Sequence, residues 1–392
     1  MSLNETPSGE RIHIGIFGKR NSGKSSLINA ITGQNLAIVS EIAGTTTDPV
    51  YKAMELLPLG PVMLIDTPGL DDVGELGEKR IEKAYQALGK TDIAVICVDI
   101  NDKNTKAEED LIKLISEKNI PFVVVRTKSD TAGEIPEKKY ENEITVSSLK
   151  KENIGELKNL LGTLIPEENK RKLVGDLINA GDTVILVVPI DKAAPKGRLI
   201  LPQQQAIRDI LDAGGYAFVT RDTEYKSLLD RLPEKPKLVI CDSQVFSKIN
   251  AETPKDIPLT SFSILMARYK GNLDIAVKGV RALEALQYGD NILISEGCTH
   301  HRQCGDIGSV KIPAWLEKHT GKKFNYTFSS GGEFTGTPER FKLIIHCGGC
   351  MLNEKEMQRR YKKADKAGIP VTNYGILISY LNGILERATE ML

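Results

Sequence analysis

The sequence predicts an α/β protein of three domains, the second and third smaller than the first and built on parallel sheets. Its 392 residues are enough for two or three separate hydrophobic cores. Short apolar runs rich in β-branched residues alternate with helical stretches along the chain, which is the pattern of strand–helix–strand units. One such run, near the N-terminus, leads directly into a glycine-rich loop that opens a helix.

Composition and charge narrow the functional classes. The chain carries 52 basic and 52 acidic residues, so no net field attracts it to nucleic acid or to an anionic membrane. No apolar run approaches the ~20 residues of a membrane span, and residues 1–13 lack the apolar core of a signal peptide. We therefore expect a cytoplasmic protein, in which the 6 cysteines serve as metal ligands or core residues rather than as disulfides.

The glycine-rich loop has the pattern of a phosphate-binding loop. A strand predicted at 12–17 is followed by Gly18-Lys-Arg-Asn-Ser-Gly-Lys-Ser25 and then by a helix. The glycines let backbone N–H groups surround the phosphates, and the helix N-terminus adds its positive dipole end. Lys24 is predicted to reach the β- and γ-phosphates, and Ser25 to ligate Mg²⁺. The predicted phosphate-binding residues are Asn21, Ser22, Gly23, Lys24, Ser25 and Ser26.

Two further segments predict a magnesium-dependent switch. An apolar strand ends in Asp66-Thr-Pro-Gly69, where Asp66 would hold Mg²⁺ through water and the Gly69 N–H would sense the γ-phosphate. Before it lies Gly44-Thr-Thr-Thr-Asp48, a polar stretch able to close on Mg²⁺ when the γ-phosphate is present. Within that stretch Thr46 is the predicted ligand. Together with the lysine of the phosphate loop, Thr46 and Gly69 are the candidate catalytic residues.

A third segment predicts which nucleotide base the protein binds. A strand at 121–125 leads into Thr127-Lys128-Ser129-Asp130. The Asp130 carboxylate can accept from the guanine N1–H and N2–H₂, which adenine does not offer in that arrangement. Ser148, at the next strand end, can supply a backbone donor to the guanine O6. Lys128, Asp130 and Ser148 are therefore the predicted base-binding residues, and the predicted nucleotide is GTP.

These segments together resemble the five motifs of the translation-factor-like GTPases, over residues 10 to about 165, and within that class the tRNA-modification and ribosome-assembly branch. Two residues depart from the pattern. Thr127 stands where the family has Asn, which leaves one guanine contact and one loop-bracing contact open. Leu70 stands where Ras-like proteins carry the water-positioning Gln, so we expect slow unaided hydrolysis. In relatives the position of Asn21 ligates K⁺, which implies K⁺ stimulation. Four acidic residues beyond Leu70 can place water, although we expect most of them to be solvated surface: Asp71, Asp72, Glu75 and Glu78.

The stretch 167–261 predicts a small α/β domain without chemistry of its own. Strands are expected at 182–189, 216–220 and 237–241, and Pro202 opens a helix. Loop 191–198 is interpreted as a surface crossover in preference to a nucleotide or partner loop. We therefore interpret this domain as a spacer or a dimerisation surface.

The last stretch, 262–392, carries a set of soft metal ligands. A long helical pattern is expected from about 262 to 286, with strands at 291–294 and 342–345. The first strand leads into Cys298-Thr-His300, and the second into His346-Cys347-Gly-Gly-Cys350. Both loops leave the carboxyl ends of strands, where open α/β sheets place their ligands.

From the residues alone, three interpretations of these cysteines remain open. They are chance cysteines, a structural zinc site of the Cys₃His type, or an iron–sulfur cluster with three cysteine ligands. A helix expected after Cys350 would direct its N-terminal N–H groups at the site and favour thiolate over thiol. Gly348 and Gly349 permit a tight loop with a close backbone approach.

The combination Cys-x-His, a gap of about 45 residues and His-Cys-x-x-Cys, behind a GTPase domain and a middle α/β domain, closely resembles the HydF family over essentially the whole chain. That family comprises the [FeFe]-hydrogenase maturation GTPases. The resemblance implies a [4Fe–4S] cluster on Cys298, Cys347 and Cys350, with His300 and His346 either as ligand or as loop-orienting residues. His301 and Cys304 lie outside the motif, and Cys304 is interpreted as a bystander.

The resemblance also implies a function and partners. The chain would be a scaffold and carrier for the di-iron precursor of the H-cluster, working with radical-SAM maturases and apo-[FeFe]-hydrogenase, and a homodimer through its middle domain. Its GTPase would act as a timer for partner docking. The expected domains are a P-loop GTPase domain at 1–166, a dimerisation domain at 167–261 and a cluster domain at 262–392.

An alternative function is a tRNA- or ribosome-directed GTPase with a structural zinc domain. The balanced charge and the lack of a basic stripe interleaved with aromatic residues count against it.

Overall fold

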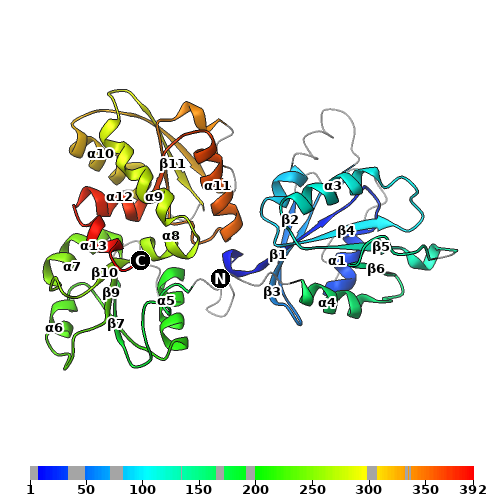
Figure 1. Cartoon of the computed structure of the whole chain (residues 1–392), viewed down its shortest axis with the longest axis horizontal. Coiled ribbons are helices and arrows are strands. Elements are labelled where there is room, and N and C mark those ends of the chain that lie inside the picture. The colour runs from blue at the N-terminus through cyan, green and yellow to red at the C-terminus, as the bar shows by residue number, and fades with distance from the viewer. Residues whose placement is uncertain are drawn as a thin grey trace. The chain divides into compact units, whose positions relative to one another are not determined.

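Three sheets organise the part of the chain that the computed structural model describes, which is residues 8–33, 49–70, 83–133, 135–164, 172–190, 199–297, 307–331, 334 and 337–392. The first sheet lies in the unit Thr6–Asn169, and the other two lie in a second unit that contains Lys170–Leu392 (Figure 1). Within the described residues, no helix has the length and apolar character needed to cross a membrane.

The first sheet has the strand order β2-β3-β1-β4-β5-β6, and all neighbours are parallel except β2 and β3. Alternate side chains of β4 enter two cores, one on each face: Val95 and Cys97 enter the first, and Ala94 and Ile96 the second. Burial on both faces explains why this strand reads as a continuous apolar run. The elements are β1 Ile12–Phe17, α1 Lys24–Thr32, β2 Val50–Leu56, β3 Gly60–Asp66, β4 Ile93–Asp99, α3 Lys106–Glu117, β5 Phe122–Thr127, β6 Glu143–Thr145 and α4 Ile154–Thr163.

The second sheet has the order β10-β9-β7-β8 and is parallel throughout, as predicted for the middle domain. Its strands and helices are β7 Thr183–Val187, α5 Leu201–Asp212, β8 Tyr216–Thr220, α6 Tyr225–Leu229, β9 Leu238–Cys241, α7 Phe246–Glu252, β10 Leu259–Ser261 and α8 Phe262–Tyr269. The edge strand β10 contacts the last helix of the chain, because the Thr260 hydroxyl donates to the Ala388 carbonyl at 2.8 Å. The other edge strand, β8, exposes several apolar side chains.

The third sheet has the order β12-β11-β13-β14 and is also parallel throughout. Its elements are α9 Leu273–Val280, β11 Asn291–Glu296, α10 Ile312–Thr320, β12 Asn325–Ser330, β13 Leu343–His346, α11 Glu354–Lys366, β14 Val371–Asn373, α12 Tyr374–Leu381 and α13 Leu385–Thr389. Helix α9 lies close against β14, since a Cβ built on Gly279 would come within 2.0 Å of the Val371 carbonyl oxygen.

One hydrophobic core joins the second and third sheets. Ile185 and Phe246, from the middle of the chain, pack in the same cluster as Ile292 and Ile345 from the last sheet. The division of the chain at 166 and 261 stays a prediction.

The single long helix expected from about 262 to 286 is wrong. Helix α8 ends at Tyr269, because Gly271 adopts a left-handed conformation with φ 70° and reverses the chain. The Asn272 N–H then bonds back to the Ala267 carbonyl at 2.8 Å, which closes the end of the helix. A separate helix, α9, begins at Leu273 and is followed by a 3₁₀ turn over Arg281–Ala285.

Candidate functional site

The phosphate loop is shaped by close backbone packing against the carboxyl ends of β4 and β5. A Cβ on Gly18 would lie 2.3 Å from the Cys97 carbonyl oxygen, so only glycine fits there. Gly23 has φ 86° and faces the Thr127 side chain, whose Cβ would be 3.2 Å from an added methyl group. Asn21, at the exposed tip of the loop, has φ 56°.

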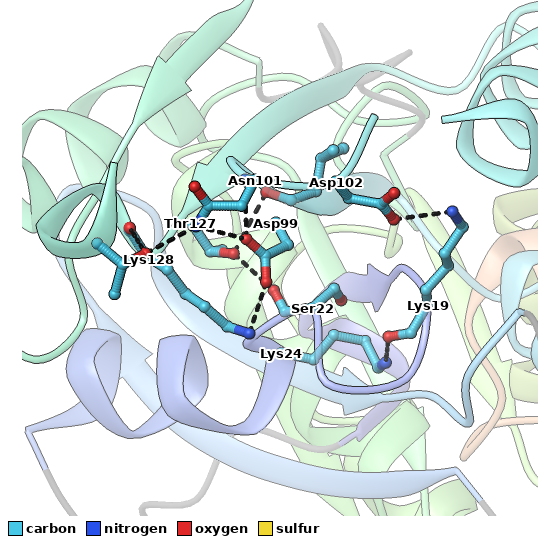
Figure 2. Close-up of polar contacts among 10 residues, drawn as sticks. Lys19, Ser22, Lys24, Asp99, Asn101, Asp102, Thr127 and Lys128 are labelled. Atoms are coloured by element: carbon cyan, nitrogen blue, oxygen red, sulfur yellow. Dashed lines mark hydrogen bonds and ion pairs between the residues drawn. The ribbon is translucent and has the colours of Figure 1, made fainter. Parts of the chain in front are cut away.

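Lys24 is buried and points into the loop that precedes it. Its ammonium donates to the carbonyl oxygens of Gly18 at 3.0 Å and Lys19 at 2.6 Å. Figure 2 shows Lys24 beside Lys19, whose own ammonium pairs with Asp102 at 2.8 Å. The carbonyl contacts of Lys24 are ones that phosphate oxygens can replace.

Two of the residues predicted to hold magnesium, one directly and one through water, come together. The Ser25 hydroxyl donates to the Asp66 carboxylate at 3.2 Å, and Asp66 is only 6% exposed. Burial raises the pKa of Asp66, while the positive charge of Lys24 and the hydrogen bond from Ser25 oppose that shift. A buried carboxylate and a hydroxyl at this distance are oxygen ligands suited to Mg²⁺.

The other predicted switch residues are only partly placed. Gly69 is described, and the next residue, Leu70, donates its backbone N–H to the Gly18 carbonyl at 3.3 Å. The segment after Asp66 therefore contacts the phosphate loop directly. Thr46 and the acidic residues beyond Leu70 lie outside the described residues.

Thr127 makes the loop-bracing contact that its replacement of Asn had left open. Its hydroxyl donates to the Ser22 carbonyl at 2.7 Å and lies 3.3 Å from the Val98 carbonyl (Figure 2). The side chain is 1% exposed. A buried hydroxyl hydrogen bond thus ties the end of β5 to the phosphate loop.

The turn after Thr127 is held by a second set of polar contacts. Lys128 has φ 61° and directs its ammonium to Asp99 at 2.6 Å. The Asn101 amide donates to the Thr131 hydroxyl at 2.8 Å, and that hydroxyl donates to the Lys128 carbonyl at 2.9 Å. These bonds fix the backbone from which Asp130 projects.

Asp130 has a partner that the sequence did not reveal. Its carboxylate accepts from the hydroxyl of buried Ser147 at 2.5 Å, and this hydrogen bond is the main reason that the pKa of Asp130 is lowered. The lowered pKa keeps Asp130 ionised, as an acceptor for guanine N–H groups must be. Ser147 precedes Ser148, the serine chosen from the sequence. Both serines follow the end of β6, and their adjacent hydroxyls could have suggested a role for either.

In the third sheet, the ends of β11 and β13 meet at Cys347. The Cys347 sulfur accepts from the backbone N–H of Gly297 at 3.0 Å and of Gly349 at 3.4 Å. Gly297 immediately precedes Cys298, which lies outside the described residues together with His300, His301 and Cys304. Cys350 is half-buried and packs against the core of the second sheet. Over the described ranges, no three His, Cys, Asp or Glu side chains form a metal-binding group.

His346 is fully buried, and both of its ring nitrogens have partners. Because a guanidinium donates and a carbonyl accepts, Nε2 accepts from Arg360 at 3.0 Å and Nδ1–H donates to the Cys347 carbonyl at 2.8 Å. Burial, reinforced by the charge of Arg360, lowers the pKa of His346 to about 3, so the ring is neutral. This geometry favours the loop-orienting role for His346, because metal binding would require the loss of one of these contacts.

A buried lysine holds the same loop from the other side. Lys270, which follows α8, is 2% exposed, and its ammonium donates to the carbonyl of Gly349 at 2.8 Å and to that of Leu352. Gly349 has φ 61°, and a Cβ there would come within 2.3 Å of the Met357 sulfur. The loop containing Cys347 and Cys350 therefore has a defined conformation.

Comparisons with known proteins match three parts of the chain. Residues 13–128 match the model of the 50S ribosome-binding GTPase family. Residues 173–271 match the hydrogen maturase F dimerization domain, and residues 274–391 match the hydrogen maturase F tetramerization domain. The last two matches together span more than half of the chain. The chain belongs to the HydF family. These matches confirm the family predicted from the sequence, and the three sheets confirm the predicted α/β fold.

Individual relatives match mainly the front of the chain. The tRNA modification GTPase MnmE of Legionella pneumophila (strain Paris) is 36% identical over 160 residues, which is 40% of this chain and 35% of the relative. MnmE of Clostridioides difficile (strain 630) is 29% identical over 234 residues, 55% of this chain and 49% of the relative. The chain thus spans between a third and a half of the length of these relatives. A crystal structure of Aquifex aeolicus Era bound to GDP and AlF₄⁻ is 22% identical with a TM-score of 0.36, covering 53% of this chain and 92% of that one.

The geometry around Asp130 predicts a switch of base preference. In Asp130→Asn an amide N–H₂ faces the base where a carboxylate stood, so it repels the guanine N2–H₂ and can donate to the C2 carbonyl of xanthine. We expect GDP to bind roughly tenfold to a hundredfold more weakly, the value of hydrogen bonds to a charged group, and xanthosine diphosphate to bind more tightly. Displacement of a fluorescent GDP analogue measures both.

Ser147→Ala is the matched control for that variant. It removes the hydroxyl that orients Asp130 but leaves the carboxylate, so we expect a smaller loss of GDP affinity and no gain for xanthosine diphosphate. Unchanged GDP affinity in Asp130→Asn would exclude Asp130 from the base site.

Proposed function

We propose that this member of the HydF family is a hydrogenase-maturation GTPase. In this proposal it holds a [4Fe–4S] cluster on Cys298, Cys347 and Cys350, and it carries the di-iron precursor of the H-cluster to apo-[FeFe]-hydrogenase. The observation that supports this most directly is the 3.0 Å contact between the Gly297 N–H and the Cys347 sulfur. It brings the chain to the Cys347 loop one residue before Cys298. Three cysteines from two strand ends form a donor set typical of iron–sulfur ligation.

The residues around Cys347 fit such a group. Backbone N–H groups from Gly297 and Gly349 already point at its sulfur, and N–H donors stabilise a thiolate more than a thiol. Neutral His346 orients the loop through the Cys347 carbonyl, and Lys270 holds the carbonyl of Gly349. When bound, a cluster with three cysteine ligands supplies an iron with an exchangeable position, to which a precursor can attach. His300 remains a candidate for that position.

We propose further that GTP hydrolysis times the docking of partners, the radical-SAM maturases and apo-[FeFe]-hydrogenase. The support is family membership together with the contact between Leu70 and Gly18, which links the segment after Asp66 to the phosphate loop. A change at the γ-phosphate can alter that contact and so the surface around it.

Iron loading tests the cysteine assignment. After anaerobic reconstitution with iron and sulfide, we expect the wild type to bind iron and, when reduced, to give an S = 1/2 EPR signal. Cys347→Ser removes a soft ligand, so iron content and signal should fall strongly. Cys304→Ser is the matched control, because Cys304 lies outside the motif, and it should keep both.

Two other outcomes of that experiment count against the proposal. If the natively purified protein contains stoichiometric zinc and takes up no iron on reconstitution, the cysteines form a structural zinc site and not an iron–sulfur cluster. Equal loss of signal in the Cys347 and Cys304 variants would contradict the ligand set.

Potassium dependence tests the role of Asn21. The residue lies exposed at the tip of the phosphate loop with φ 56°. In this proposal its side chain ligates a cation beside the phosphates. Other GTPases use an arginine finger to place positive charge at the transition state, and we expect this cation to supply that charge here. GTP turnover in K⁺ should exceed that in Na⁺ roughly tenfold, equivalent to about 1.4 kcal/mol of barrier.

Asn21→Ala should lose this difference while retaining GDP affinity, because the phosphate-loop backbone and Lys24 remain. Equal wild-type turnover in the two salts would refute the K⁺ role.

We propose that the homodimer forms through strand β8. It is an edge strand of the second sheet, and Tyr216, Phe218 and Val219 expose 61%, 40% and 46% of their surface. An apolar edge strand is a template for pairing with another chain, and a second copy of the same strand satisfies both its backbone groups and its side chains. The match to a dimerization domain over residues 173–271 includes this strand.

A charge on that edge tests the interface. We expect Phe218→Lys to lower the oligomeric state measured by light scattering, because the ammonium would be buried against an apolar partner. Leu149→Lys is the matched control, since Leu149 is 82% exposed and lies outside the stretches that match the dimerization and tetramerization domains. An unchanged oligomeric state in Phe218→Lys would exclude β8 from the interface.

A further inference from the structure

The Thr127 hydroxyl is already used in bracing the phosphate loop. A hydroxyl has one hydrogen to donate, and here that hydrogen goes to the Ser22 carbonyl at 2.7 Å, with the Val98 carbonyl at 3.3 Å. The side chain is 1% exposed and packs beneath Gly23. What remains on the Thr127 oxygen is lone-pair density.

Guanine offers a different chemistry at each of its two polar edges. The Watson–Crick edge has N–H donors, which suit the Asp130 carboxylate, whereas N7 on the other edge accepts hydrogen bonds. An Asn at position 127 would carry two N–H groups, one for the loop carbonyl and one for N7. A threonine oxygen whose hydrogen is committed presents lone pairs to an acceptor, and no hydrogen bond forms between them.

Two neighbouring polar side chains also have partners. The Lys128 ammonium lies 2.6 Å from Asp99, and the Asn101 amide bonds to the Thr131 hydroxyl. By contrast, the residue predicted to bind the Watson–Crick edge, Asp130, is oriented by a hydrogen bond from the hydroxyl of buried Ser147.

We propose that Thr127 leaves N7 of guanine unread, so that the base gains its binding affinity from the Watson–Crick edge and none from N7. This inference rests on the proposed base-binding role of Asp130. It follows that guanine nucleotides with a carbon at position 7 bind as well as GDP. Nucleotides altered on the Watson–Crick edge do not.

The test is competition against a fluorescent GDP analogue on the full-length protein, with three probes. They are GDP, 7-deaza-GDP, in which C–H replaces N7, and inosine diphosphate, which lacks the N2 amino group. For the wild type we expect GDP and 7-deaza-GDP to agree within about twofold, and inosine diphosphate to bind at least about threefold more weakly because the carboxylate loses a donor.

Two substitutions of Thr127 separate its roles. Thr127→Asn adds the second N–H, so GDP should become preferred over 7-deaza-GDP by roughly threefold to tenfold, the value of one neutral hydrogen bond. Thr127→Val has the same shape without the hydroxyl, so it should weaken GDP and 7-deaza-GDP by the same factor through the lost brace.

The outcomes separate a failure of the N7 inference from a failure of the proposed base-binding role of Asp130. A wild type that binds 7-deaza-GDP several-fold more weakly than GDP, with the difference abolished in Thr127→Val, means that Thr127 does read N7 and overturns the inference. Equal wild-type affinity for inosine diphosphate and GDP instead overturns the role of Asp130. If Thr127→Asn does not fold, the ratios in the wild type and in Thr127→Val still decide the question.

Discussion

Buried parallel strands impose a single constraint on this chain. A strand covered on both faces accepts few polar side chains along its length, so polar groups collect where the strand ends. Asp66 and Thr127 are the last residues of β3 and β5, and the phosphate loop begins where β1 ends. In the third sheet His346 ends β13, and Gly297 follows the end of β11. Two sites with unrelated chemistry therefore have the same architecture.

The sequence predicted those strands that a local pattern of residue types determines. Apolar β-branched runs indicated the strands that carry the phosphate loop and the cysteine loops, because a buried strand needs such residues whatever surrounds it. It did not predict the break at Gly271, where a glycine in the middle of an otherwise helical pattern ends the helix. Nor did it predict β12, whose residues are mostly polar, or the three-residue strands β10 and β14. These strands exist because neighbouring strands supply hydrogen bonds, which local composition does not reveal.

In the two candidate sites, too, the sequence predicted some features and not others. The types of residue in the motifs predicted their chemistry, but the partners of those residues come from elsewhere. Ser147 reaches Asp130 across 17 positions, and Arg360 reaches His346 across 14. Thr127 is the clearest case. The sequence showed that Thr replaces the Asn of the family, but it did not show that the Thr127 hydroxyl bonds to the Ser22 carbonyl, 105 positions away.

The contact of Lys270 with the cysteine loop bears on how the chain can be divided. Lys270 belongs to the stretch that matches the dimerization domain, and the carbonyls it binds belong to the stretch that matches the tetramerization domain. Cutting the chain between residues 271 and 274 would separate a buried cation from acceptors worth about 1.5–3 kcal/mol each. A cysteine domain transferred to another protein would therefore have to include α8 and Lys270. The smallest segment that can be transferred intact is thus longer than the stretch that matches the tetramerization domain.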